Sequence, residues 1–304
     1  MRKVLIEGTG WIYDDLGIEP YYNAGVAISS SYDKGEDVDF SASGLSLPPQ
    51  LYVLKKHRWQ EIKIPISDLT YAIDGAALHL LLEQHADNKH YRVEERCVVD
   101  LDGVKISGKP DLWQEGGYLI DWKRMSVWEA IYGLNIDKEA QANVYAWLIK
   151  KSLGIHIEDL RIVGIFRDYS KGKALREGPD SDYPQAPVKV MSLPRWEDSR
   201  VEAYIRERVT ILQKADEMYP ELLPCTREDQ WRTVKYAVTK AGRSRSIKNF
   251  DSKADAQAWM AQQNDAQEMF IEDRVGEPTR CLQSPGGYCP VRAFCPQALK
   301  ERGK

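Results

Sequence analysis

The apolar positions of this chain predict one block of mixed secondary structure between residues 71 and 220. Short segments that favour strands are interleaved with longer segments whose apolar residues recur at helical spacing. This order of elements predicts an α/β (α+β) fold, with a mixed central β-sheet flanked by helices. The predicted elements are a helix at 72–86, strands at 92–100, 103–113 and 117–124, a helix at 137–152, strands at 160–166 and 188–192 on either side of a loop at 171–187, and a helix at 195–218.

The two ends of the chain are patterned less clearly than this block. Residues 1–70 mix short predicted strands and loops with one short helix at 50–59, and we expect them to form a lid or an oligomer contact. Residues 221–304 contain a basic hairpin around Ala241-Gly242 and a cysteine-rich segment. The sequence therefore predicts three regions, with the chemistry expected in residues 71–220.

Two acidic residues and a lysine fall on a predicted hairpin within the central block. Pro110-Asp111 lies at the end of one predicted strand, and Asp121-Trp122-Lys123 lies in the next. Strand side chains alternate between the two faces, so Asp121 and Lys123 project to the same side, and the hairpin brings Asp111 alongside them. Two carboxylates and an ammonium on one face suit a divalent cation and a water held beside a phosphate.

The Pro-Asp pair followed by Asp-x-Lys resembles the signature of the PD-(D/E)xK nucleases, with aspartate at the variable carboxylate position. A helical run upstream carries His79 among apolar residues, and a helix downstream carries Gln141 and Tyr145 four residues apart on one face. This order is similar to that of the RecB-like branch, which includes phage recombination and CRISPR-adaptation exonucleases. The resemblance covers residues 75–150 and implies a restriction-endonuclease-like core.

The resemblance also implies a divalent metal site, because the helix histidine and both carboxylates bind metal in RecB-like enzymes. Mg²⁺ and Mn²⁺ prefer oxygen ligands, and an imidazole ligand shifts the preference toward Mn²⁺. Glu83, one helical turn after the histidine, is a further candidate ligand, and Glu95 is either a supporting residue or faces solvent. A lone histidine among apolar residues is otherwise more often a core residue. The implied ligands are His79, Asp111, Asp121 and the Trp122 carbonyl.

The residues implied to act in catalysis lie beside this metal site. A nearby cation and partial desolvation are expected to lower the pKa of Lys123, so that it orients or deprotonates the attacking water. Alternatively, its ammonium acts as a fixed positive charge on the transition state. Gln141 and Tyr145 are implied to contact substrate, or else they form a polar pair on an exposed helix face. The candidate catalytic set is Lys123, Asp111, Asp121, Gln141 and Tyr145.

The net charge of −4 hides an uneven distribution. Residues 1–50 hold eight acidic and three basic side chains, so the other 254 residues sum to +1. The span 232–250 has six basic residues and no acid, so it either neutralises DNA phosphates or is an ordinary solvated hairpin. Arg124 either contacts phosphate or forms a surface ion pair. The candidate DNA-binding residues are Arg124, Lys235, Lys240, Arg243, Arg245 and Lys248.

Four cysteines in the C-terminal region form a second group of candidate ligands. Four thiolates can hold a zinc ion or a 4Fe–4S cluster. Iron–sulfur RecB-like nucleases typically end in Cys-x2-Cys-x5-Cys, with their first cysteine upstream of the core. Here the Cys-x5-Cys is present, but seven residues precede it after the previous cysteine, and the fourth cysteine follows the core. The alternative is four unrelated thiols, and Cys97 is expected simply to be buried. The candidates are Cys225, Cys281, Cys289 and Cys295.

These observations lead to one functional expectation and two alternatives. We expect a Mg²⁺- or Mn²⁺-dependent deoxyribonuclease, an exonuclease acting on DNA ends in recombination, repair or CRISPR-related processing. The alternatives are an endonuclease on the same core, and a DNA-binding or interaction protein with a zinc-stapled fold that does not cleave. The expected partners are single- or double-stranded DNA, a recombinase or annealing protein, and further copies of the chain.

The setting expected for this protein follows from two absences in the sequence. No apolar run is long enough to cross a bilayer, and no signal-peptide pattern precedes the first acidic residue, Glu7. We therefore expect a cytoplasmic protein of a bacterium or a phage-infected cell, without a membrane partner.

Overall fold

The structure is a computed structural model that describes residues 2–31, 35, 37–87, 89–243, 245–282 and 288–302 of the chain. The chain divides into two compact units. The first unit comprises Met1–Leu47 and Lys55–Pro220, and the second comprises Pro48–Leu54 and Glu221–Lys304. No helix in the described ranges combines the length and the apolar character needed to cross a membrane.

A five-stranded mixed sheet forms part of the first unit. In order across the sheet, its strands are β11 (Val188–Leu193), β10 (Asp159–Phe166), β9 (Tyr118–Met125), β8 (Leu112–Trp113) and β5 (Arg92–Val93). β9 and β10 are parallel, and the other neighbouring pairs are antiparallel. The mixed sheet predicted from the sequence is therefore present.

The first unit also contains two three-stranded sheets. Their strands are β1 (Lys3–Ile6), β2 (Gly10–Tyr13) and β4 (Lys63–Pro65) in one sheet, and β3 (Phe40–Ser41), β7 (Val104–Gly108) and β6 (Cys97–Leu101) in the other. β7 ends at Gly108 and β8 begins at Leu112, so the three residues between them carry the chain from one sheet to the next. Asp111 is the last of these three residues.

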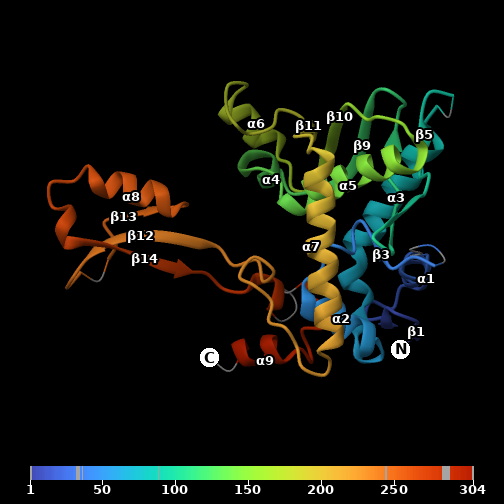
Figure 1. Ribbon diagram of the computed structural model, residues 1–304, viewed down its shortest axis with the longest axis horizontal. Coiled ribbons are helices and arrows are strands. Elements are labelled where there is room, and N and C mark those ends of the chain that lie inside the picture. The colour runs from blue at the N-terminus through green and yellow to red at the C-terminus, as the bar shows by residue number, and fades with distance from the viewer. Residues whose placement is uncertain are drawn as a thin grey trace. The chain divides into compact units, whose positions relative to one another are not determined.

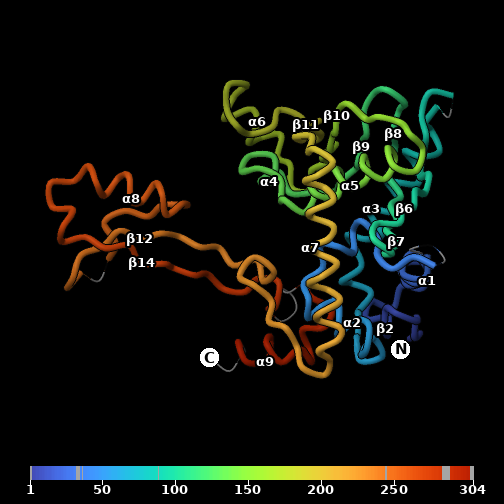
Figure 2. Tube along the Cα trace, in the orientation of Figure 1, coloured from blue at the N-terminus to red at the C-terminus, as the bar shows by residue number. Residues whose placement is uncertain are grey.

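The helices of the first unit pack against these sheets or against one another. They are α1 (Glu19–Ser30), α3 (Thr70–Gln84), α4 (Val127–Tyr132), α5 (Ile136–Leu153), α6 (Lys171–Glu177) and α7 (Asp198–Glu217), with 3₁₀ helices at Trp59–Glu61 and Ile66–Leu69. α3 lies against β9, and α5 lies against β6, β7, β9 and β10 (Figure 1, and the chain trace in Figure 2). The Asn135 side chain accepts a hydrogen bond from the Asp137 N–H at 3.0 Å and so caps α5. Gly154 ends this helix in the left-handed conformation, with φ of 72°.

Most predicted elements of the central block are confirmed, with differences of a few residues at their ends. Two predicted strands are each divided: 92–100 forms β5 and β6, and 103–113 forms β7 and β8. The loop predicted at 171–187 is wrong over its first half, which forms α6. The Ser170 side chain caps this helix, and Ala174 belongs to a buried cluster with Phe166, so capping and packing outweigh the glycine within it.

The N-terminal region holds a helix, α1, where short strands and loops were predicted. Pro20 lies in its first turn, where a missing N–H costs nothing. Gly25 allows the helix to approach Ile66, since a Cβ at that glycine would lie 2.2 Å from Ile66 Cδ1. Tyr22 and Ile66 are buried together with Ile12, so tertiary packing explains a helix that local pattern did not indicate.

The second unit contains a three-stranded antiparallel sheet. Its elements are β12 (Val234–Lys240), β13 (Lys248–Phe250), α8 (Lys253–Ala261), β14 (Met269–Val275), α9 (Pro296–Arg302), and 3₁₀ helices at Ala266–Glu268 and Thr279–Cys281. Residues Pro49–Leu54 of α2 (Pro49–His57) belong to the same unit. β12 and β13 form the hairpin predicted around Ala241-Gly242, and α8 packs against all three strands of the sheet.

Candidate functional site

The hairpin of β8 and β9 places two aspartates opposite each other. Leu112 pairs with Ile120, so Asp111 faces Asp121 at the next position along both strands. The Trp122 N–H donates a hydrogen bond to Asp111 Oδ2 at 2.7 Å and holds that carboxylate in place. Asp111 is 7% exposed and Asp121 is 4% exposed. The two carboxylates that the sequence placed on one hairpin are therefore buried side by side.

Lys123 lies two residues after Asp121 on the same strand, and its ammonium contacts that carboxylate. The distances from Nζ are 3.0 Å to Asp121 Oδ1 and 2.8 Å to Oδ2. Burial acts to lower the pKa of Lys123, but the negative charges of Asp121 and Asp111 outweigh it and raise the pKa. The lowered pKa expected from the sequence assumed a nearby cation, whereas with the chain's own charges alone the pKa is raised, because two carboxylates face the ammonium.

Asp111 titrates far from the usual range of an aspartate. Burial, followed by the charge of Asp121, raises the pKa of Asp111 to about 6, although Lys123 and His79 act to lower it. Two buried carboxylates repel each other, and one of them takes up a proton more readily as a result. A divalent cation held between the two would remove this repulsion, which makes the pair suited to binding metal.

α3 brings His79 to the same place. Its Nε2 lies 3.2 Å from the Trp122 carbonyl oxygen, and its Nδ1 lies 3.6 Å from Asp111 Oδ1. A carbonyl oxygen only accepts, so Nε2–H donates this hydrogen bond and leaves the Nδ1 lone pair, on the Asp111 side, as the one that can bind a cation. Among the described residues, ligand atoms of His79, Asp111 and Asp121 do not all lie within 4.8 Å of one another, so a shared cation would draw them closer together. Carboxylate, carbonyl and imidazole groups together are a donor set for Mg²⁺ or Mn²⁺.

Two glutamates lie next to His79 and enlarge this acidic group. Ligand atoms of His79, Glu83 and Glu94 all lie within 4.8 Å of one another. Glu83 is the candidate ligand one turn after the histidine, whereas Glu94 was not identified from the sequence. The Glu94 N–H donates a hydrogen bond to the Asp111 carbonyl oxygen at 3.2 Å, which connects the two parts of the site.

Glu94 was missed because the strand predicted at 92–100 is interrupted. β5 ends at Val93, and Glu94 adopts a positive φ of 51°, so side-chain alternation along a continuous strand does not apply here. Glu95, the neighbour considered instead, has its carboxylate 3.9 Å from Arg92 Nε. Three charged residues in a row, Glu94-Glu95-Arg96, are unusual inside a half-buried strand and are the signal that could have indicated the break.

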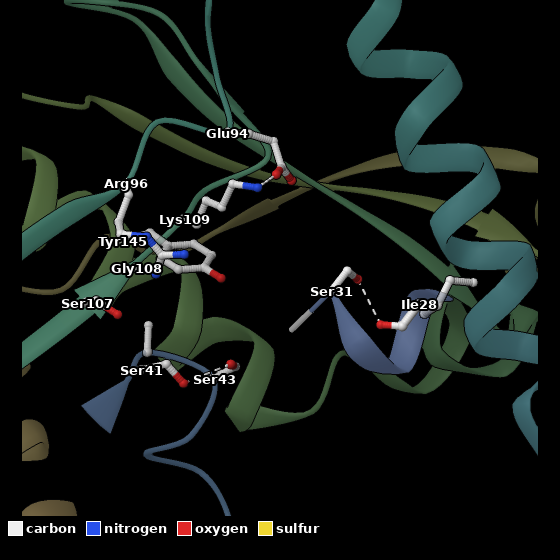
Figure 3. A pocket seen from close by; sticks show the side chains of 11 residues that line it. Ile28, Ser31, Ser41, Ser43, Glu94, Arg96, Ser107, Gly108, Lys109 and Tyr145 are labelled. Atoms are coloured by element: carbon white, nitrogen blue, oxygen red, sulfur yellow. Dashed lines mark hydrogen bonds and ion pairs between the residues drawn. The ribbon is translucent and has the colours of Figure 1, made fainter. Parts of the chain in front are cut away.

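A cavity of about 500 Å³ adjoins this acidic group (Figure 3). Glu94 lines it together with Lys109, and the two side chains form an ion pair. Arg96 supplies a second cation to the lining. Hydroxyl groups line the cavity from Ser31, Ser41, Ser43, Ser107 and Tyr145. The cavity thus presents cationic and hydroxyl groups beside the candidate metal ligands.

Gln141 and Tyr145 are joined by a hydrogen bond in which Gln141 Nε2 donates to the Tyr145 hydroxyl at 2.8 Å. Tyr145 is 7% exposed and lines the cavity just described. Its ring packs on Gly108, where a Cβ would lie 2.7 Å from Tyr145 Cδ1. The pair is therefore not on an exposed helix face, because Tyr145 is buried and Gln141 is half-buried.

Arg124 forms the ion pair that the sequence left as one of its alternatives. Its Nε lies 2.6 Å from Asp74 Oδ2, and its side chain is 26% exposed. Asp74 belongs to α3, the helix that also carries His79. The pair therefore links α3 to β9 close to the two aspartates.

The basic hairpin of the second unit is more nearly neutral than its sequence suggests. Lys235 forms an ion pair with Asp251, and Lys240 pairs with Asp265 and Glu268. Lys248 lies over two aromatic rings, 5.1 Å from the Phe250 centroid and 5.4 Å from that of Trp259. Arg243 and Arg245 are exposed in the turn. The acidic partners lie outside the acid-free span, so the sequence pattern alone did not reveal them.

The four candidate cysteines line one small cavity in the second unit. Burial raises the pKa of Cys225 to about 12 and that of Cys281 to about 11, and burial also raises the pKa of Cys289. Cys295 donates a hydrogen bond from Sγ to Gln50 Oε1 at 3.0 Å. Cys97 is buried in β6 of the first unit at 2% exposure, as expected.

The spacing of these sulfur atoms bears on the group they could hold. All four belong to the described part of the chain, and no three of them lie within 4.8 Å of one another. Thiolates around one tetrahedral zinc ion, with Zn–S bonds of about 2.3 Å, lie about 3.8 Å apart. The sulfur atoms therefore lie farther apart than ligands of one bound zinc ion, and the cavity that they line has a volume of only about 20 Å³.

Comparisons with known proteins add little to this picture. No family model matches the chain, and no curated protein matches it. Among solved structures, the crystal structure of SSO0001 is similar over 64% of this chain and 85% of that chain, with 18% identity and a TM-score of 0.42. An alkaline exonuclease (LHK-Exo) from Laribacter hongkongensis is similar over 58% of this chain and 89% of that chain, with 14% identity and a TM-score of 0.31. Both TM-scores are below 0.5, so only the geometry of this chain's own residues bears on its function.

Proposed function

We propose that this chain is a metal-dependent deoxyribonuclease of the PD-(D/E)xK type. The observation that carries the proposal is the burial of Asp111 and Asp121 side by side, with Lys123 against one carboxylate and His79 against the other. Burying two like charges costs folding stability. A function that needs both carboxylates explains why the fold keeps them. Titratable groups that perturb one another in this way are typical of functional sites.

The residues that would hold the ion are His79, Asp111, Asp121 and the Trp122 carbonyl. A bound Mg²⁺ or Mn²⁺ would supply Lewis-acid activation of the phosphate and neutralise charge that develops on it. Glu83 and Glu94 are close enough to His79 to orient it or to accept a hydrogen bond from a water in the site.

The chain's own residues would contribute charge and orientation to the hydrolysis. Lys123, whose ammonium contacts Asp121, would act as a fixed cation that donates to the phosphoryl oxygens. Deprotonation of the attacking water would then fall to a carboxylate, and Glu94 and Asp111 are the candidates. Hydrolysis would be direct, with water attacking in line and no covalent intermediate on the enzyme.

The cavity beside the site supports a nucleic-acid substrate. Hydroxyl groups together with Lys109 and Arg96 can receive backbone phosphates of the strand whose scissile bond lies at the acidic group. Gln141 and Tyr145, joined on the wall of this cavity, would hold the substrate or the waters around it. The cavity adjoins the candidate ligands through Glu94, which belongs to both.

We propose further that the enzyme is an exonuclease that acts on DNA ends in recombination, repair or CRISPR-related processing. The test compares end-labelled linear DNA with covalently closed circles in Mg²⁺, Mn²⁺ or EDTA, using wild type and Lys123→Ala. Loss of linear DNA alone, dependent on metal and on Lys123, is expected. Cutting of closed circles would favour an endonuclease on the same core. Binding without cleavage in every metal would favour a protein that does not cleave.

For the cysteines, we propose that Cys225, Cys281, Cys289 and Cys295 hold a 4Fe–4S cluster. The supporting observations are that all four cysteines line one cavity and that no three of their sulfur atoms lie within 4.8 Å of one another, which is wider than the ligands of one zinc ion. Anaerobically purified protein should contain iron and sulfide and absorb broadly in the visible range. Cys289→Ala should lose this absorbance, whereas Cys97→Ala, at a buried cysteine outside the cavity, should keep it. Stoichiometric zinc without iron would contradict the assignment.

A further inference from the structure

The short helix α4, which follows the strand carrying Asp121 and Lys123, exposes two aromatic rings. Trp128 and Tyr132 are 43% and 80% exposed, although Val127 and Ile131 on the other side of the helix pack into the core. The two rings are four residues apart and stack on each other, with centroids 5.7 Å apart and planes 11° apart. Exposed apolar groups that lie together, unlike scattered single residues, are candidate binding surfaces.

Positive charge lies next to these rings. α6 lies beside α4 (Figure 1), and Lys173 Nζ stands 4.3 Å from the centroid of Trp128. Lys171 and Arg176 of the same helix are exposed, and its acid, Glu177, lies 3.5 Å from Lys173. The aromatic pair is therefore accompanied by a helix with three basic residues and one acidic residue.

A second aromatic ring paired with a cation, Tyr71 with Arg167, connects α3 to the end of β9 that precedes α4. Arg167 stacks on Tyr71, with 4.9 Å from Cζ to the ring centroid, and Tyr71 is 58% exposed. The Arg167 N–H bonds the Met125 carbonyl oxygen at the end of β9 at 3.0 Å. Tyr71 precedes His79 by eight residues on α3, which corresponds to about 12 Å along the helix.

Asp168 continues this connection to α4. Its carboxylate accepts hydrogen bonds from the Ser126 hydroxyl at 2.6 Å and from the Val127 N–H at 2.7 Å. Trp128 follows directly. A series of neighbouring contacts therefore leads from the helix that carries His79, through the Tyr71–Arg167 pair, to the exposed rings of α4.

We propose that Trp128 and Tyr132, with Lys173 beside them, form a stacking platform for the unpaired bases of single-stranded DNA leading to the active site. The proposal rests on the nuclease function proposed above. Aromatic side chains bind bases of any sequence because every base has a π-face, and nearby cations neutralise the backbone phosphates. Bases inside a duplex are already paired and stacked, so this surface would select substrates with a single-stranded end or stretch.

The test measures the affinity of a fluorescent single-stranded oligonucleotide in EDTA, so that binding is separated from cleavage. Tyr132→Ala should weaken binding roughly tenfold, because the stacking of a base on the ring is lost. Tyr132→Phe should bind as wild type, and Tyr132→Leu should not, because an aliphatic side chain offers area without a π-face. Leu175→Ala, at another exposed apolar residue on α6, is the matched control and should bind as wild type.

Two further substrates make this result specific. With an oligonucleotide that carries abasic sites in place of bases, wild type and Tyr132→Ala should bind equally. Wild type and Tyr132→Ala should also bind blunt duplex DNA with affinities that agree within about twofold. The proposal is overturned if Tyr132→Leu restores single-strand binding, if the effect persists with abasic DNA, or if duplex binding falls as much. The first of these outcomes would mean that apolar area, and not stacking on a π-face, binds the strand.

A small activated phosphodiester, bis-p-nitrophenyl phosphate, separates this proposal from the proposed nuclease activity, because it cannot reach from the active site to α4. The platform alone would be refuted if wild type hydrolyses this compound in Mn²⁺ but Tyr132→Ala binds single-stranded DNA as tightly as wild type. Wild type that binds single strands through Tyr132 but hydrolyses neither this compound nor DNA would refute the nuclease and leave the platform standing.

Discussion

Two hairpins of this molecule are rich in charged residues, and they hold their charges in opposite ways. In the β8–β9 hairpin, Asp111 and Asp121 are buried, the half-buried Lys123 contacts Asp121, and the pKa values of Asp111 and Lys123 are displaced. In the β12–β13 hairpin, Lys235 and Lys240 each pair with acidic residues from elsewhere in the unit. A high density of charge along the sequence therefore does not indicate a site. Charges that are buried against one another do.

The largest effect that tests this comparison is the loss of the Lys123 ammonium, which contacts the buried carboxylate of Asp121. Lys123→Ala should lower the initial rate of linear DNA cleavage in Mg²⁺ roughly 10²- to 10³-fold, because the transition state loses a preorganised cation. Lys235→Ala, a lysine paired at the surface of the other hairpin, is the control and should change the rate less than twofold. Equal losses in the two variants would show that the hairpins do not differ in the way described.

Glu94 offers a sharper test, because its neighbour in sequence provides the control. Glu94→Gln should lower the cleavage rate roughly 10- to 100-fold, since its carboxylate lies with those of the ligands and its charge is lost. Glu95→Gln removes the same charge one residue away, where the carboxylate is near Arg92, and should leave the rate nearly unchanged. If the two variants behave alike, the acidic group does not include Glu94.

The raised pKa of Asp111 predicts a pH dependence with a definite sign. Its folded-state pKa of about 6 lies above the usual 3.8, so the protonated carboxyl stabilises the metal-free fold fully below about pH 3.8. That stabilisation is lost as the pH rises through about 6. In EDTA, the melting temperature of wild type should therefore fall relative to that of Asp111→Asn between pH 5 and pH 7.5. A constant difference between the two proteins over this range would show that the carboxyl titrates normally.

The smallest expected effect concerns the turn of the basic hairpin. Arg243 and Arg245 are exposed in that turn, so they are the residues of the hairpin best placed to meet phosphate. If they do, replacing both with alanine should lower the slope of log affinity against log salt by about 1.8 for duplex DNA. Replacing Lys235 and Lys240 should leave that slope unchanged. If replacing the two lysines lowers the slope more than replacing the two arginines, the ion pairs of the lysines open when DNA binds.

The sequence predicted that the two aspartates of the candidate site meet, because this part of its geometry is local. Asp111 and Asp121 are ten residues apart on a hairpin, where strand alternation and register decide which side chains meet. Strand alternation could not predict the position of Glu94, because the strand ends at Val93 and Glu94 itself adopts a positive φ. Asp265 and Glu268 likewise reach Lys240 only through the tertiary fold. What was missed therefore depends on backbone breaks and long-range pairing, which single-residue patterns do not encode.

The most direct test of the central claim is a calorimetric titration of Mn²⁺ into EDTA-treated, dialysed protein, comparing wild type with Asp111→Asn. We predict a binding site in the first unit of wild type whose affinity falls at least tenfold in the variant, while the circular dichroism spectra remain alike. Affinity in wild type should also weaken as the pH is lowered through about 6, because protons compete for the carboxyl. Absence of binding in wild type, or equal binding in the two proteins, would contradict the assignment of the buried hairpin as a metal site.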